Sequence, residues 1–356
     1  MRINNTNLII DQLPDYFSIS DQSAERIKKL LGRLPNSLNG IFEFDILNKA
    51  SSIDYSQAIG KTDEEKEKFH RFVEKQLKEA SKDEQIVWEK IHTFSTHWIQ
   101  KNYQFNKLIE NIWLEFDNSN DSLPSIFFSF NKIIDKDKQL QITKSILSIF
   151  YEEKFLSSIC AKICNYIKYK ELEFPFLQLG LMFPRKYNQI KLVIGPVQIT
   201  EINTFVARVS GMDKNRIPEF FINEFADQFV NISLDIAGNI ENKFGLEFII
   251  FNKLNAENII KKIKYFLVNH NYIDQTGFNN ILNWETCLRP SQTEQFWPDS
   301  IIFESIIGDK FTFPKIEYSV NHFKICFTGT AISQIKCYLY YRFTNRKSKT
   351  GNITVF

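Results

Sequence analysis

Cationic and phenolic side chains alternate along one segment near the end of the 356-residue chain. Six residues of this kind occupy three segments of alternating sequence: Lys336, Tyr338, Tyr340 and Arg342 in the last segment, with Lys324 and Lys191 in two others. Alternate residues of a β-strand lie on one face. Ammonium and guanidinium groups bind phosphate or carboxylate oxygens through charge-assisted hydrogen bonds. The six residues therefore predict an anion-binding site beside aromatic hydroxyl groups.

A second set with the same spacing is acidic and aromatic: Trp113, Glu115 and Asp117 in one segment, Glu43 and Asp45 in another. An ionised group inside a protein costs several kcal/mol unless it is paired or serves a function. Charges repeated at alternate positions therefore predict one of two interiors. Either the interior holds solvent or ligand, or the charges form a network of Lys–Glu and Lys–Asp pairs.

The segments that carry these residues are short, alternate with period two and come in pairs, which is typical of β-hairpins. Five pairs are predicted: 40–47 with 51–59, 112–117 with 124–130, 176–183 with 189–195, 232–237 with 244–251, and 322–329 with 334–343. The intervening segments have a helical period of 3.6 residues and room for two helices each: 62–102 with a break near 81–83, 136–169, 199–210 with 217–229, and 256–271 with 275–287. A further helix is predicted over 20–34.

Ten antiparallel strands with every helix on one side must cover their sheet edges, and closing the sheet into a barrel removes the edges. We therefore expect an α+β fold: a ten-strand antiparallel barrel of five αββα repeats with an outer ring of helices. The apolar face of each strand, such as Phe42 and Phe44 of the first, would pack on the helices. Both charged sets would then point into the barrel. Residues 40–356 are predicted to form this single domain, after a helical lead-in over 1–39.

Five αββα units closing a ten-strand barrel resemble the ABBA, or PT-barrel, fold of soluble aromatic and peptide prenyltransferases. The resemblance implies an allylic diphosphate as donor and an aromatic small molecule or peptide as acceptor. It implies that the diphosphate binds the six cationic and phenolic residues, and that a carboxylate near Trp113 takes the proton lost by the acceptor. Glu115 is the first choice for this catalytic group and Glu43 the second. No cofactor is required, and Mg²⁺ is compatible with the scheme.

The pattern departs from the family in one respect: the inward faces of the first, second and fourth pairs offer no Lys or Arg, so the ring of basic residues is partial. Two alternatives stay open for this reason. One is a non-catalytic barrel that serves as a binding or scaffold protein of a small-molecule or modified-peptide pathway. The other is a different enzyme that uses the acidic interior, with or without Mg²⁺, on a cationic or peptide substrate.

Composition and the lack of known motifs exclude several classes of protein. A formal net charge of +2 gives no global field for nucleic acid. No apolar stretch is long enough for membrane insertion, so a cytoplasmic protein is expected. Five cysteines without CxxC spacing predict neither a disulfide framework nor a zinc site. Nucleotide, protease and hydrolase motifs are absent.

Three other features have simpler interpretations. His92 and His97 lie five residues apart on a predicted helix, which is a poor spacing for one metal ion, so packing or surface roles are expected. The charged run over 63–84 is typical of a solvent-exposed helix face. The stretch 289–314 is rich in proline and contains an exposed-looking EQFW segment, so it is predicted to be a loop that covers one mouth of the barrel.

Overall fold

Strands come in antiparallel pairs with helices between them throughout the residues that the computed structural model describes. These residues are 6–35, 39–48, 53–101, 103–118, 120–131, 135–167, 177–185, 189–210, 217–236, 243–250, 256–293, 297, 301–303 and 312–347. None of the described helices has the length and apolar character needed to cross a membrane.

Ten strands follow the predicted pairs: β1 (Asn39–Asp45), β2 (Asp54–Gly60), β3 (Ile109–Asp117), β4 (Asn120–Phe130), β5 (Gln178–Leu181), β6 (Ile190–Gln198), β7 (Phe229–Asp235), β8 (Lys243–Ile249), β10 (Thr312–Thr328) and β11 (Ala331–Lys347). They are hydrogen-bonded in this sequence order, and β11 pairs with both β10 and β1. A sheet whose last strand pairs with its first has closed on itself. The predicted ten-strand antiparallel barrel is therefore confirmed.

Two helices separate consecutive strand pairs, as the periodicity predicts. They are α3 (Asp63–Glu79) and α4 (Lys82–Ile99), α6 (Lys136–Phe150) and α7 (Glu153–Ile167), α8 (Ile202–Ser210) and α9 (Glu219–Phe225), and α10 (Ala256–Asn269) and α11 (Gln275–Leu282). The short helix α5 (Gln104–Leu108) precedes β3, and α1 (Thr6–Ile10), η1 (Asp15–Phe17) and α2 (Asp21–Arg33) precede β1. Side-chain caps fix the starts of several helices; the Thr62 hydroxyl, for example, accepts from the Glu65 N–H at 3.3 Å before α3.

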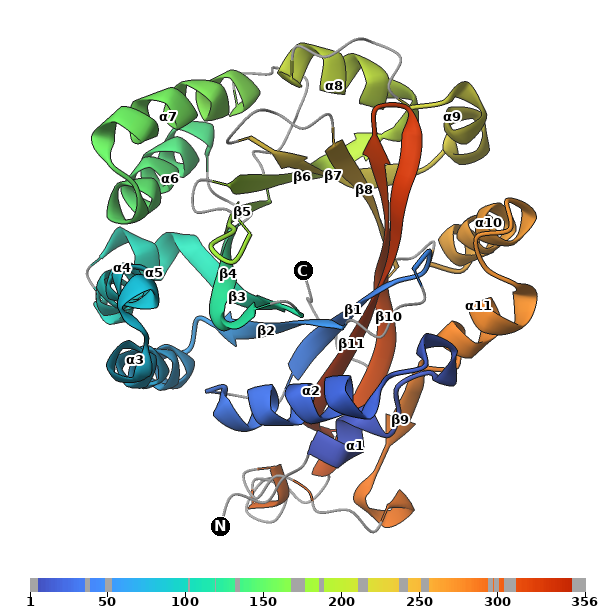
Figure 1. The fold of residues 1–356 in the computed structure, drawn as a ribbon, viewed down its shortest axis with the longest axis horizontal. Helices are drawn as coiled ribbons and strands as arrows, with labels where there is room; N and C mark the ends of the chain where they lie inside the picture. The colour runs from blue at the N-terminus through green and yellow to red at the C-terminus, as the bar shows by residue number, and fades with distance from the viewer. Residues whose placement is uncertain are drawn as a thin grey trace. The chain divides into compact units, whose positions relative to one another are not determined.

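The chain forms two compact units: residues 1–55, 248–324 and 334–356 make the first, and residues 56–247 and 325–333 make the second. The predicted boundary between a lead-in over 1–39 and one domain over 40–356 stays a prediction. In the second unit, α3, α4, α6, α7 and α8 lie on one face of the sheet from β2 to β8 (Figure 1). We call this face of the strands outer and the opposite face inner.

Aromatic contacts show why the outer face binds the helices. In the first unit, the Phe44 ring of β1 stacks on Phe17 of η1, with ring centroids 4.0 Å apart. In the second unit, Phe128 of β4 meets Phe94 of α4 edge-on at 4.9 Å. All four side chains are at most 2% exposed. The prediction that the apolar faces pack on helices is confirmed.

The predicted loop over 289–314 is corrected in two places. Strand β10 begins at Thr312, ten residues before the predicted start, and so includes Pro314. The EQFW segment is not exposed at its tryptophan: Trp297 is 6% exposed and packs edge-on against Phe343, with centroids 5.8 Å apart. Residues 294–296, 298–300 and 304–311 lie outside the described part of the chain, so the proposed cover of a barrel mouth stays a prediction.

The helix predicted over 275–287 is too long. Helix α11 ends at Leu282, and Thr286–Leu288 form the short strand β9, which pairs with β10 opposite Ile316–Tyr318. Strand β9 pairs with β10 alone and lies outside the ring of ten strands, so it adds a strand to the sheet but not to the barrel.

Candidate functional site

The inner face of the first unit carries an ion pair between β1 and β11. Glu43 lies opposite Tyr338 and Asp45 lies opposite Lys336, and directly opposed residues share a face. The Lys336 ammonium donates to a Glu43 carboxylate oxygen, and only 14% and 7% of the two side chains are exposed. Pairing with a carboxylate is thus the role that the structure gives Lys336.

Asp45 has a different task from the one predicted. Its carboxylate oxygens accept from the Leu47 backbone N–H at 3.0 Å and from the Asn48 side-chain amide at 2.7 Å. Both contacts hold the turn that follows β1. The predicted acidic set is therefore reduced, on this strand, to Glu43.

An imidazole lies against one of the predicted phenols. The rings of His322 and Tyr338 stack with centroids 3.8 Å apart and planes 15° apart. On β10 the most deeply buried positions are Ile316, Tyr318 and Val320 and then Phe323, Ile325 and Phe327, so the alternation changes phase at Asn321 and His322. This irregularity places His322 on the inner face over Tyr338. Lys324 follows two residues later and is 7% exposed.

Tyr340 and Arg342 lie at the other end of the same face. Burial raises the pKa of the Tyr340 phenol above its usual value; Glu317 adds to the increase, while Arg342, which is hydrogen-bonded to the phenol, opposes it. Lys315 and Glu317 form an ion pair on β10. Positive charge on this face is therefore accompanied by carboxylates.

In the second unit, one row of inner-face residues runs in register across five strands: Trp113, Phe127, Gly180, Lys191 and Asp235. Trp113, Lys191 and Asp235 are only partly buried, whereas their outer-face neighbours are fully buried. The Phe127 ring covers Gly180, since a Cβ atom at Gly180 would lie 2.5 Å from Phe127 Cε1. Aromatic faces and one lysine thus share a partly accessible surface.

Glu115 and Asp117 lie beside this row and bind one arginine that the sequence analysis passed over. Arg185 donates to both Asp117 oxygens at 2.7 Å and to a Glu115 oxygen at 2.9 Å. The two carboxylates are 9% and 6% exposed, and the arginine side chain is 29% exposed. Ser125, opposite Glu115, has a buried hydroxyl oxygen with no hydrogen-bond partner among the described residues.

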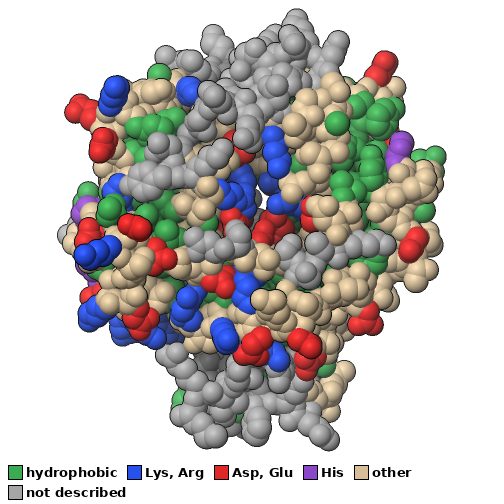
Figure 2. Space-filling view, viewed as in Figure 1, with side chains coloured by type: hydrophobic (Ala, Val, Ile, Leu, Met, Phe, Trp, Pro, Cys, Tyr) green, Lys and Arg blue, Asp and Glu red, His purple; other side chains and the backbone are tan. Residues whose placement is uncertain are grey.

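The site residues predicted from sequence are therefore divided. Glu43, Lys324, Lys336, Tyr338, Tyr340 and Arg342 belong to the first unit, and Trp113, Glu115 and Lys191 to the second. On the face shown in Figure 2, Lys and Arg side chains are interspersed with Asp and Glu side chains and are not segregated by sign. Among the described residues, none of these carboxylates belongs to a group of three side chains placed to hold a metal ion; the one such group lies in the helices.

Comparisons with known proteins agree with the fold. No protein-family model and no curated protein matches the chain. Among solved structures, 5-dimethylallyltryptophan synthase from Streptomyces coelicolor is similar, with 10% identity, a TM-score of 0.53, and coverage of 95% of this chain and 98% of that one. The prenyltransferase PriB is similar with 8% identity and a TM-score of 0.56, over 97% of this chain and 99% of that chain.

Both similar enzymes have also been solved with bound molecules. The synthase was solved in complex with DMASPP and Trp, and PriB with L-tryptophan and dimethylallyl thiolodiphosphate. At 8–10% identity, the likeness concerns the fold: this chain has the ABBA, or PT-barrel, architecture that its element order predicts.

Proposed function

We propose that the chain is a prenyltransferase-like enzyme that transfers an allylic group from a diphosphate to an aromatic or peptide side chain. The observation that carries the proposal is the inner row of the second unit, where Trp113 and Phe127 share a partly accessible face with Lys191. Three strand spacings separate Trp113 from Lys191, or roughly 14 Å along the sheet. That length accommodates a short allylic diphosphate and an aromatic ring side by side.

Each part of the row has a task in this proposal. The bond between the allylic carbon and the diphosphate oxygen breaks, and its electron pair leaves with the diphosphate. Lys191 stabilises the charge that develops on the leaving oxygens. The faces of Trp113 and Phe127 hold the allylic cation and the acceptor ring away from water. A new bond then joins the allylic carbon to the acceptor.

Glu115 takes the proton that the acceptor loses in this step. Arg185 donates a charge-assisted hydrogen bond to this carboxylate at 2.9 Å, which fixes its orientation. Arg185 is thus a positioning residue. That the cationic and phenolic residues of β10 and β11 bind diphosphate stays a prediction from the sequence, and Lys336 is paired with Glu43. The proposal requires no cofactor and is compatible with Mg²⁺.

The test is a product assay on the full chain. Dimethylallyl diphosphate is mixed with L-tryptophan or a tryptophan-containing peptide, with and without Mg²⁺, and the acceptor is analysed by chromatography and mass spectrometry. We expect an acceptor heavier by one dimethylallyl group. Glu115→Gln should lower kcat by about 100-fold or more, whereas Glu89→Gln, on the exposed face of α4, should not. Absence of product with every acceptor would overturn the proposal.

A second candidate is the non-catalytic barrel that binds a small molecule or modified peptide. The observation that favours it is the pairing of both candidate catalytic carboxylates with cations, Glu43 with Lys336 and Glu115 with Arg185. A diphosphate would have to compete with these carboxylates. Acceptor binding without donor binding would support this second candidate.

We also propose a cytoplasmic location. None of the five cysteines is in a disulfide, and reduced thiols are usual in a reducing compartment. Fractionation of the cells that produce the protein tests this, and recovery in a secreted fraction would contradict it.

A further inference from the structure

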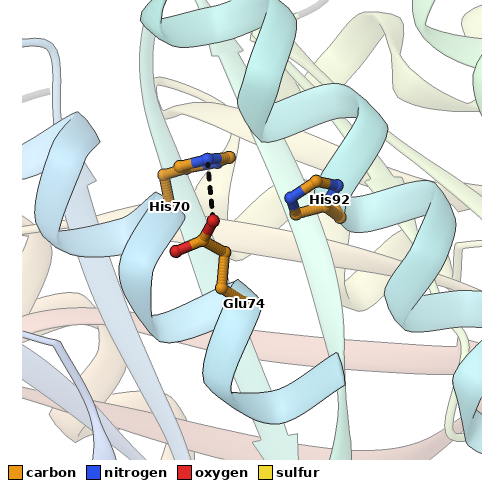
Figure 3. A group of neighbouring side chains, drawn as sticks. All are labelled: His70, Glu74 and His92. Atoms are coloured by element: carbon orange, nitrogen blue, oxygen red, sulfur yellow. Dashed lines mark ion pairs between the residues drawn. The ribbon is translucent and has the colours of Figure 1, made fainter. Parts of the chain in front are cut away.

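Two helices of the second unit bring three potential metal ligands together. His70 and Glu74 lie one turn apart on α3, and His92 lies on α4 (Figure 3). One ligand atom of each residue lies within 4.8 Å of the other two, and the His70 Nε2 to Glu74 Oε1 distance is 3.7 Å. The His70 and His92 rings are stacked with centroids 5.0 Å apart. The three side chains thus converge from two helices on one point.

Ser95 determines which nitrogen of His70 carries the proton. The Ser95 hydroxyl donates its hydrogen to the His92 carbonyl at 2.9 Å. The same oxygen lies 2.9 Å from His70 Nδ1 and, with its hydrogen directed to the His92 carbonyl, accepts from the Nδ1–H of His70. Neutral His70 therefore presents the lone pair of Nε2 towards Glu74.

A lone pair and a carboxylate oxygen then face each other without a hydrogen between them. The His70 side chain is 18% exposed, which limits how far water can screen the two acceptors. A cation between them would satisfy both.

We propose that His70, Glu74 and His92 bind a divalent transition-metal ion, preferably Zn²⁺, and that this ion cross-links α3 and α4. Two imidazoles and one carboxylate are ligands that suit Zn²⁺ and disfavour Mg²⁺ and Ca²⁺. Bonds of about 2.0–2.1 Å put the ligand atoms of a tetrahedral zinc about 3.4 Å apart. The ligand atoms lie within 4.8 Å of one another, with His70 Nε2 and Glu74 Oε1 at 3.7 Å, so the side chains have to close in only slightly on the ion. Glu74, 49% exposed, leaves the fourth position open to water.

Ser95 is the positioning residue of this site. A metal-binding histidine usually donates its second ring N–H to a fixed acceptor, which orients the ring and sets its tautomer. Ser95 is fully buried, and its hydroxyl provides that acceptor for His70. The site lies in the helices that cover the outer face of the sheet, so its role is to stabilise the helix pair and not to take part in prenyl transfer.

The test is calorimetric titration of the full chain with ZnCl₂. The accessible thiols, including that of the exposed Cys287, are first blocked by alkylation. We expect one Zn²⁺ per chain and a higher melting temperature on binding. His92→Gln and Glu74→Gln should weaken binding by at least tenfold, and Ser95→Ala by about 10–100-fold. Co²⁺ should give the visible absorption of tetrahedral coordination, which a merely structural role for the three residues would not produce.

Two matched variants control for charge and for a histidine elsewhere. Glu67→Gln removes an exposed carboxylate from the same helix α3, and His270→Gln removes an exposed imidazole just after the end of α10. Both should bind Zn²⁺ as the unaltered chain does. The proposal is overturned if the chain binds no Zn²⁺, or if the variants at His92 and Glu74 bind it as tightly as the two controls.

Discussion

Arg185 holds two buried carboxylates, so its replacement tests the charge arrangement of the second unit. Arg185→Met removes the three hydrogen bonds to Glu115 and Asp117 and keeps much of the apolar volume of the side chain. Breaking a buried ion pair by removing one partner costs about 3–5 kcal/mol. Because the arginine side chain is 29% exposed and water can enter, we expect the lower end of this range, about 3 kcal/mol.

The assay is urea unfolding of the full chain followed by tryptophan fluorescence. Arg71→Met is the matched control, since Arg71 is exposed on α3, and its effect should stay within about 0.5 kcal/mol. Neutral replacements of Glu115 and Asp117 distinguish two causes of a stability loss, namely a buried carboxylate left without its cation and the loss of packing by the arginine side chain. The triple variant with Arg185→Met, Glu115→Gln and Asp117→Asn should be more stable than Arg185→Met alone. If Arg185→Met is as stable as the control, or if the losses in the triple variant simply add, Arg185 does not stabilise the two buried carboxylates.

Three further predictions concern individual contacts. Lys336→Met leaves Glu43 buried without its cation and should lower the free energy of unfolding by about 3 kcal/mol, and restoration by the double variant with Glu43→Gln is the check. Gly180→Ala places a methyl group against the Phe127 ring and should lower the free energy of unfolding in urea by about 1–3 kcal/mol. Gly32 has open space around it, so Gly32→Ala should not lower this free energy. Equal effects of the two variants would contradict the close packing of Phe127 on Gly180. Because burial lowers the pKa of His70 in the folded state, the unfolded chain binds more protons near pH 6. The free energy of unfolding should therefore fall as the pH drops through about 6.5. In metal-free protein, His70→Gln should make this dependence of stability on pH weaker.

The strand faces could be predicted because period-two alternation is a local property of the sequence. The observed register places Trp113 opposite Phe127 and Glu43 opposite Tyr338, each on the inner face that their spacing indicates. A shift of one residue would have moved buried charges into the helical layer at a large cost. The barrel followed from element order, since unpaired edges of a ten-strand sheet have to be covered.

The start of β10 was missed although its alternation is visible in the sequence. Ile316, Tyr318 and Val320 are buried and the residues between them are not, which is a strand pattern. Pro314 at the beginning suggested a loop, and because the alternation changes phase at His322, the predicted strand was taken to start there. Proline is compatible with a strand near its first residues.

Arg185 and the histidine cluster could not be found from periodicity. Arg185 follows β5 in a turn, where neither residue type nor spacing determines direction; the available signal was that two buried carboxylates, Glu115 and Asp117, require a cation. His70 and Glu74 are one helical turn apart, which the sequence does show. Their partner His92 is on the next helix, so recognising the group requires the packing of α3 against α4.

Binding of an unreactive donor shows whether the inner face of the second unit recognises an allylic diphosphate. Dimethylallyl thiolodiphosphate is titrated into the full chain and into Lys191→Met, with the exposed Lys261→Met of α10 as control. We expect the unaltered chain and the control to bind the donor. Lys191→Met should bind it more weakly by about 1.5–3 kcal/mol, the contribution of a charge-assisted hydrogen bond. If the unaltered chain does not bind this donor, or if Lys191→Met binds it equally well, Lys191 is not part of a diphosphate site.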